Sequence, residues 1–149
     1  IGATGRAKTG ELKVSVGYED GYITEGGINY GGHNAFSKAK LATEIVRKRL
    51  QLLKIPVDAF KEDYIGADSL YHGVLPVPEY VSEIRARIAT RTSSLEAARE
   101  VVREVKSLYT NGPSAGGGVR TITQKIVAIA SITVPENDIS TRVDYEEVK

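Results

Sequence analysis

The stretch VSEIRARIATRTSSLEAAREVVREVKSLYTNG (81–112) decides the expected fold. From Val81 to Thr92 small or apolar residues alternate with charged ones, the period-two pattern of a strand with one covered and one exposed face. Ser93-Ser94-Leu95-Glu96 then predicts a helix start, because serine and glutamate three positions apart can satisfy the first free N–H groups. Asn111-Gly112-Pro113 would end that helix. The stretch therefore predicts a half-exposed strand followed by an amphipathic helix.

The segments before this stretch predict two more strands and another helix. Residues 12–18 alternate in period two, and Glu19-Asp20-Gly21 is a turn signal that would fold residues 22–24 back as a hairpin. The glycines between positions 26 and 32 favour either a twisted strand or a loop shaped for close approach. Asn34 can begin a helix that runs to about Lys54, and residues 64–70 form a short expected strand.

The segments after it are a glycine run and an apolar run. Thr110-Asn111-Gly112-Pro113-Ser114-Ala115-Gly116-Gly117-Gly118-Val119-Arg120 is rich in small residues, and its backbone can approach a ligand closely. Two interpretations stay open: a cradle for an anion, or a flexible loop after a helix C-cap. Residues 126–134 are nearly all apolar, which favours a central strand covered on both faces.

The order strand, helix, strand, strand, helix, strand is that of the ferredoxin-like split βαββαβ fold of the α+β class. We expect a four-stranded antiparallel sheet with both helices on one face and a glycine-rich hairpin inserted after the first strand. Residues 1–10 would be a linker or arm, residues 11–134 a single domain, and residues 135–149 an acidic tail. The uncovered sheet face would carry Arg85 and Arg87.

Composition excludes several classes of function. The chain has 149 residues, a formal net charge of +1, no cysteine and only two histidines. Thiolate catalysis and cysteine metal sites are excluded, and no metal site or cofactor is expected. The small net charge and the absence of long apolar runs argue against nucleic acid and membrane as partners. Because the chain starts at Ile1 and contains no methionine, we expect a processed product, a fragment or an excised domain.

The glycine run supplies the candidate binding residues. Loop amides with a hydroxyl and a guanidinium could hold a phosphate or carboxylate. The candidates for anion binding are Asn111, Ser114, Gly116, Gly117, Gly118 and Arg120. The weaker candidates for acid–base chemistry are Asp20, Glu25 and Asp68. Asp68, Ser69 and His72 lie too close in sequence to form a hydrolytic triad easily, so turn capping by Asp68 and Ser69 is the favoured interpretation.

Several segments together resemble the acyclic terpene utilisation (AtuA) family. They are GATGR (2–6), LKVSVGYEDGYITEG (12–26), the start of the basic helix, IGADSL (65–70) and YTNGPSAGGGVR (109–120). The similarity is to the C-terminal portion of longer chains and covers nearly all of residues 2–140. The family pattern reads Ser-Leu-His-Gly where this chain has Ser69-Leu70-Tyr71-His72-Gly73, and residues 27–34 also differ from it.

The resemblance implies a cytoplasmic protein of citronellol or geraniol catabolism, in which intermediates are coenzyme A thioesters. It implies two kinds of partner: an N-terminal α/β region or a second chain, in a homo- or hetero-oligomer, and an acyl-CoA thioester. Two functions remain open. The domain either contributes to an anionic substrate site shared with the α/β region, or is a non-catalytic assembly module that works through its open sheet face.

Overall fold

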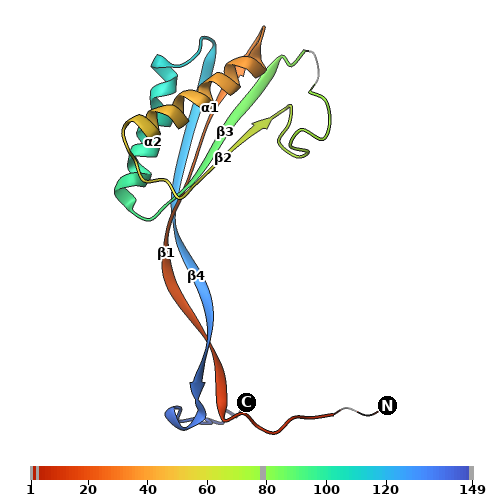
Figure 1. Cartoon of the computed structure of the whole chain (residues 1–149), viewed down its shortest axis with the longest axis vertical. Coiled ribbons are helices and arrows are strands. Elements are labelled where there is room, and N and C mark those ends of the chain that lie inside the picture. Colours follow the sequence, from red (N-terminus) through yellow and green to blue (C-terminus); the bar gives the residue numbers. More distant parts are fainter. Residues whose placement is uncertain (1, 3, 78–79, 148–149) are drawn as a thin grey trace. The chain divides into compact units, whose positions relative to one another are not determined.

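The computed structural model describes residues 2, 4–77 and 80–147. Its elements follow the expected order (Figure 1). They are β1 (Glu11–Gly31), α1 (Ala35–Leu52), β2 (Ala59–Ile65), β3 (Glu83–Thr92), α2 (Leu95–Asn111), β4 (Gly116–Pro135) and the 3₁₀ helix η1 (Glu136–Asp138). Residues 1, 3, 148 and 149 of the expected arm and tail lie outside the described residues.

The sheet has the strand order β2-β3-β1-β4. Strand β3 pairs antiparallel with β1, from Tyr22 opposite Thr92 to Gly31 opposite Glu83, and antiparallel with β2, from Ala59 opposite Arg91 to Ile65 opposite Arg85. Both helices pack on one face of this sheet (Figure 1). The predicted ferredoxin-like α+β fold is therefore confirmed.

The chain divides into two compact units. The first, which we call the αβ core, comprises residues 19–126 and contains both helices, β2, β3 and the adjoining parts of β1 and β4. The second, which we call the ribbon unit, comprises residues 1–18 and 127–149. It contains the remaining parts of β1 and β4, which form a two-stranded ribbon, and η1 (Figure 1).

Alternation and helical periodicity place the hydrophobic centre of the αβ core between the sheet and the helices. Ile84, Ala86 and Ile88 of β3 are buried, as the period-two pattern predicts. The helices contribute buried residues at helical spacing: Ala35, Ala39, Ala42, Val46 and Leu50 from α1, and Ala98, Val101, Val105 and Leu108 from α2. A Cβ at Gly26 would lie 2.8 Å from Val105 Cγ1, so this glycine allows α2 to approach β1 closely.

Local capping explains where α2 begins and ends. Ser94 is the N-cap, and its Oγ accepts a hydrogen bond from the Ala97 N–H at 3.2 Å. At the other end the Gly112 N–H donates to the Leu108 carbonyl at 3.0 Å. Helix α1 also begins where predicted, although Asn34 makes no side-chain capping bond and adopts a left-handed conformation with φ 60°. No helix among the described residues is long and apolar enough to span a bilayer.

The predicted hairpin within residues 12–24 is wrong. Residues 11–31 form one strand of 21 residues, and Gly21 lies inside it with φ +88°. A Cβ at Gly21 would lie 2.4 Å from the Thr92 carbonyl oxygen, so the position needs glycine for a close approach to β3. The same residue type serves turns and close approaches, and the sequence alone did not separate the two.

The predicted short strand at residues 64–70 is displaced. Strand β2 comprises Ala59–Ile65, and the following residues form turns. The period-two alternation of β2 is hard to recognise in the sequence, because the side of the strand that faces the helices also carries polar groups. The Tyr64 hydroxyl shares a 2.7 Å hydrogen bond with Thr43 of α1. Arg47 of α1 donates a hydrogen bond to Glu62 at 2.7 Å. Asp68 Oδ1 accepts from the Gly73 N–H at 2.7 Å, which is the turn-capping role expected for it.

The predicted central position of residues 126–134 is wrong as well. They belong to β4, which is an edge strand of the sheet, while the inner strands are β1 and β3. None of these residues is buried, and Val127 and Ile129 are strongly exposed. A continuous apolar run predicts a surface that is covered by other residues, but it does not identify the segment or chain that covers it.

The buried hydroxyl of Tyr30 gives a stability prediction. Tyr30 is fully buried, and its Oη has no hydrogen-bond partner among the described residues. Removing an unpaired buried hydroxyl is expected to stabilise a protein, so Tyr30→Phe should raise the free energy of unfolding by about 1 kcal/mol at pH 7. Tyr64→Phe is the matched control and should lower it by about 1 kcal/mol, because Tyr64 would lose its bond to Thr43. Urea titration measures both, and a loss of stability in Tyr30→Phe would contradict the assignment.

The same residue predicts a pH dependence. Burial raises the pKa of Tyr30 from 10.0 to about 12. Because the folded state favours the neutral hydroxyl, its contribution to stability is complete below pH 10 and is lost as the pH rises toward 12. Tyr30→Phe should therefore lose less stability than the unsubstituted chain over that interval. Equal losses in both proteins would contradict the expected pKa.

Candidate anion site on the open sheet face

The sheet face opposite the helices, called the open face below, carries a network of ion pairs. Arg87 of β3 lies between two carboxylates: its Nη2 is 2.5 Å from Glu25 Oε2 on β1, and its Nη1 is 2.6 Å from Asp63 Oδ2 on β2. Arg91 pairs with Asp20 at 2.7 Å. Alternation along β3 predicted the arginine face, but the acidic partners come from strands that meet β3 only in the fold.

The ion pair with Arg87 determines how the acid–base candidate Glu25 is charged. The hydrogen bond from Arg87 lowers the pKa of Glu25 below 4.5, and the bond to Glu25 raises the pKa of Arg87. A carboxylate with a lowered pKa accepts a proton poorly at neutral pH. Asp20 is held by Arg91, and Asp68 lies in the turn after β2. The structure thus places the three candidates at separate positions, each with a bonding partner of its own.

A small hollow lies beside this network. Its volume is about 100 Å³, and Glu25, Arg85, Arg120 and Ile122 are among the residues that line it. Arg85 Nη1 donates to Asn29 Oδ1 at 2.8 Å, which fixes its guanidinium on the strand surface. A Cβ at Gly27 would lie 3.0 Å from Arg85 Nη2, so glycine makes room for that guanidinium. The hollow is therefore lined by two arginines from different strands.

Neither Arg85 nor Arg120 forms an ion pair with any of the described residues. The four cations of this region are Lys61, Arg85, Arg87 and Arg120, and its three carboxylates are Glu25, Asp63 and Glu83, so the positive charges exceed the negative ones by one (4 − 3). Guanidinium groups bind carboxylates and phosphates through paired N–H donors. The arrangement can hold one carboxylate or phosphoryl group.

The glycine run has a structural place that the sequence did not reveal. Gly116, Gly117 and Gly118 are the first residues of β4. A Cβ at Gly116 would lie 2.8 Å from Tyr30 Cε1, so this glycine packs against the hydrophobic centre of the αβ core. Gly117 has open space around it, and Gly118 has φ +65° and lies near the Asn29 amide. Of the three, only Gly117 and Gly118 are placed toward free space or polar neighbours.

The remaining candidates for anion binding do not gather in one place. Arg120 borders the open-face hollow. Asn111 lines a different hollow of about 280 Å³ together with Arg49, Ser107 and residues of both helices. Ser114 is exposed in the turn before β4. Arg85 joins the site instead; sequence alternation placed it on the open face, but nothing in the sequence paired it with Arg120.

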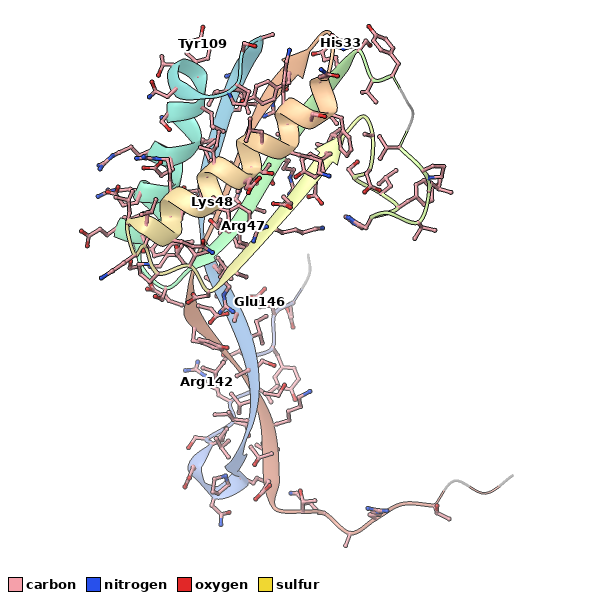
Figure 2. The ribbon with its side chains drawn as sticks, turned by 45° about the horizontal axis from the view of Figure 1, so that its top comes forward. His33, Arg47, Lys48, Tyr109, Arg142 and Glu146 are labelled. Carbon is pink, nitrogen blue, oxygen red and sulfur yellow. The ribbon has the colours of Figure 1, made fainter. Side chains whose placement is uncertain are left out.

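A third hollow lies at the start of α1, where Figure 2 labels His33. Its volume is about 140 Å³, and it is lined by residues that include His33, Ser37 and Tyr80. The exposed N–H groups of a helix start favour anions. This lining carries no arginine or lysine, so we give the open-face hollow precedence as the candidate site. No cluster of three or more histidine or acidic side chains suited to a metal ion occurs within residues 2, 4–77 and 80–147.

The basic side chains of α1 are largely engaged within the chain. Arg47 bonds to Glu62 and stacks over the Phe60 ring at 4.2 Å, while Lys48 pairs with Glu44 at 2.7 Å (Figure 2). Arg49 binds the buried carboxylate of Glu104 on α2, which links the two helices. The basic side chains Arg47, Lys48 and Arg49 of this surface are therefore used in ion pairs within the chain.

The family model of the acyclic terpene utilisation family protein AtuA matches residues 1–145. The chain belongs to the AtuA family. Membership supports a role in acyclic terpene utilisation and confirms the family resemblance of the sequence segments. No curated protein matches this AtuA chain.

Three solved structures that are similar to this AtuA chain have low sequence identity to it. A de novo designed protein, Ferredog-Diesel, is 16% identical with a TM-score of 0.38, and the match covers 82% of this chain and 98% of that one. A hypothetical Arabidopsis thaliana protein is 14% identical with a TM-score of 0.40, covering 75% and 94%. GlnK of B. subtilis in complex with ATP is 18% identical with a TM-score of 0.28, covering 72% and 86%. TM-scores below 0.5 add nothing to the function of the AtuA chain.

Proposed function

We propose that this domain binds the anionic end of a substrate of acyclic terpene breakdown on its open sheet face. The observation that carries the proposal is the hollow between Arg85 and Arg120, two guanidinium groups without carboxylate partners among the described residues. Intermediates of such a route carry either a carboxylate or the phosphates of a coenzyme A thioester. Both groups match paired guanidinium donors.

The size of the hollow limits what the domain can do alone. About 100 Å³ holds a single charged group and leaves the apolar part of a terpenoid acid uncovered. The proposal therefore includes a second surface, from an α/β region or another chain, that covers the rest of the ligand and supplies the chemistry. The cytoplasmic location implied by the resemblance is part of the same proposal.

The test is direct binding of citronellyl-CoA, free coenzyme A and citronellate, measured by calorimetry. Arg85→Ala and Arg120→Ala should each weaken binding about 10- to 100-fold, the loss expected for one charge-assisted pair. Arg103→Ala is the matched control, because Arg103 is an exposed arginine on α2 that pairs with Glu100, and it should change affinity less than twofold. Equal losses in all three variants would contradict a localised site.

The assembly module remains the second candidate, and a specific observation favours it. The open face also carries three half-exposed isoleucines, Ile23, Ile65 and Ile122. Exposed apolar residues beside paired charges are typical of a protein interface. If none of the three ligands binds and Ile23→Lys changes the mass of the assembly, the open face is an interface and not a ligand site.

A further inference from the structure

The ribbon unit has one face that is apolar except for a single hydroxyl group. A Cβ at Gly17 would lie 3.6 Å from Val127 Cγ1, so Gly17 and Val127 lie on the same side of the ribbon. Side chains alternate between the two sides of a strand. The other side therefore carries Leu12, Val14, Val16 and Tyr18 of β1 with Ala128, Ala130, Ile132 and Val134 of β4. We call this side the apolar face of the ribbon; the Tyr18 hydroxyl is its only polar side-chain atom.

The apolar face needs a cover. A two-stranded ribbon is marginally stable at best in water, and three or more strands or a packed layer are needed for independent stability. Val16, Tyr18 and Ile132 are at least 38% exposed. The other five residues of the face are partly buried, and the apolar tail residues Ile139, Val143 and Tyr145 are themselves exposed. Nothing charged lies on the face, so it offers no pairing to an anionic or basic partner.

The side chains on one half of this face are self-complementary in size. The Glu136 N–H donates to the Gly10 carbonyl at 2.9 Å. Counting from that bond along a regular antiparallel ladder puts Ala130 at the level of Val16 and Ala128 at the level of Tyr18. If two ribbons stack face to face about a twofold axis along their length, β1 of one copy lies over β4 of the other. Val16 and Tyr18 of β1 then meet the alanines of β4, whereas Val14 and Leu12 meet Ile132 and Val134.

The charges of the ribbon permit the same pairing. Residues 11–18 and 127–135 contain one acidic residue, Glu11, and one basic residue, Lys13, so their net charge is zero (1 − 1). Both lie on the side of Gly17, away from the apolar face. Two copies would therefore bring no like charges into the contact.

We infer that the apolar face of the ribbon is a homodimer contact, in which two copies of this chain stack into a four-stranded, two-layered sandwich. This contact is independent of the anion site proposed on the open sheet face. Two strands of this length present less than the roughly 800 Å² per partner of a standard interface, so the dimer should dissociate on dilution.

Sedimentation velocity of the full chain over a range of concentrations, from micromolar to millimolar, tests the inference. Ile132 and Ile129 provide a matched pair, since both are isoleucines of β4, exposed by 44% and 75%, on opposite sides of the ribbon. Ile132→Lys should weaken dimerisation by at least about 30-fold, because it buries a charge in an apolar contact, and Ile129→Lys by less than about threefold. A chain that stays monomeric throughout, or equal effects of both substitutions, would overturn the inference.

Crosslinking gives an answer even if a lysine disturbs folding. The chain has no cysteine, so Ile132→Cys and Ile129→Cys each introduce a single thiol by a mild change. Stacked sheets lie about 10 Å apart, which is too far for a direct disulfide but within reach of a short bismaleimide. Covalent dimer should form with Ile132→Cys and not with Ile129→Cys. The reverse result, or dimer from neither protein, would refute the stacked arrangement.

Discussion

Replacing Gly21 by alanine is expected to lower the free energy of unfolding by about 3 kcal/mol. Two effects add at this position. The backbone has φ +88°, where an L side chain is strained, and the new Cβ would lie 2.4 Å from the Thr92 carbonyl oxygen. The contact is to backbone of the neighbouring inner strand, so no side-chain rotation can relieve it. Either β1 and β3 separate locally or the ladder between them shifts.

Gly117→Ala is the matched control for this experiment. Gly117 also lies in a strand, but its φ is not positive and a Cβ there would meet no atom within 4 Å. Its replacement should leave stability unchanged or raise it by up to about 1 kcal/mol, since alanine reduces the entropy of the unfolded chain. Urea titrations of both variants measure the difference. A loss of less than 1 kcal/mol at Gly21 would mean that residues 18–24 rearrange easily.

Gly21 also shows which parts of the fold the sequence could predict. Strand β3 and helix α2 were predicted correctly because their signals are local: alternation, a serine cap and an asparagine–glycine–proline ending. At Gly21 the same local logic predicted a turn, whereas the carbonyl of Thr92, distant in sequence, decides the conformation. A glycine in a sequence indicates only that either backbone freedom or space for a close contact is needed. The fold decides which of the two applies.

The candidate site has the same limitation. Alternation placed Arg85 on the open face, and the glycine run drew attention to Arg120. Their meeting depends on how β1, β3 and β4 are ordered in the sheet, and no local pattern encodes that order. The central position predicted for residues 126–134 was wrong for a related reason. A strand that is covered by a second layer of the same chain and a strand that is covered by another chain can have the same apolar composition.

The second large effect is expected at Arg87, where Arg87→Leu should cost about 2 kcal/mol of unfolding free energy. Asp63 is 5% exposed, and Arg87 bonds to one of its oxygens at 2.6 Å. Without Arg87 the nearest cation is Lys61, whose Nζ is 3.4 Å from the other oxygen and whose side chain is mostly exposed. A buried carboxylate would lose its main partner. The expected loss of unfolding free energy is smaller than for a fully buried ion pair, because Arg87 is itself partly exposed and water screens the interaction.

Two further variants separate this cause from simple loss of an arginine. Arg91→Leu removes the neighbouring arginine on the same face, but its partner Asp20 is about one-third exposed, so the expected cost is below about 1 kcal/mol. Asp63→Asn in the Arg87→Leu background removes the unpaired buried charge and should recover about half of the lost unfolding free energy.

Because Arg87 also holds Glu25 at the rim of the hollow, Arg87→Leu should change citronellate affinity as well, whereas Asp63→Asn alone should not. A double variant less stable than Arg87→Leu would show that the arginine acts through packing of its stem and not through the buried carboxylate.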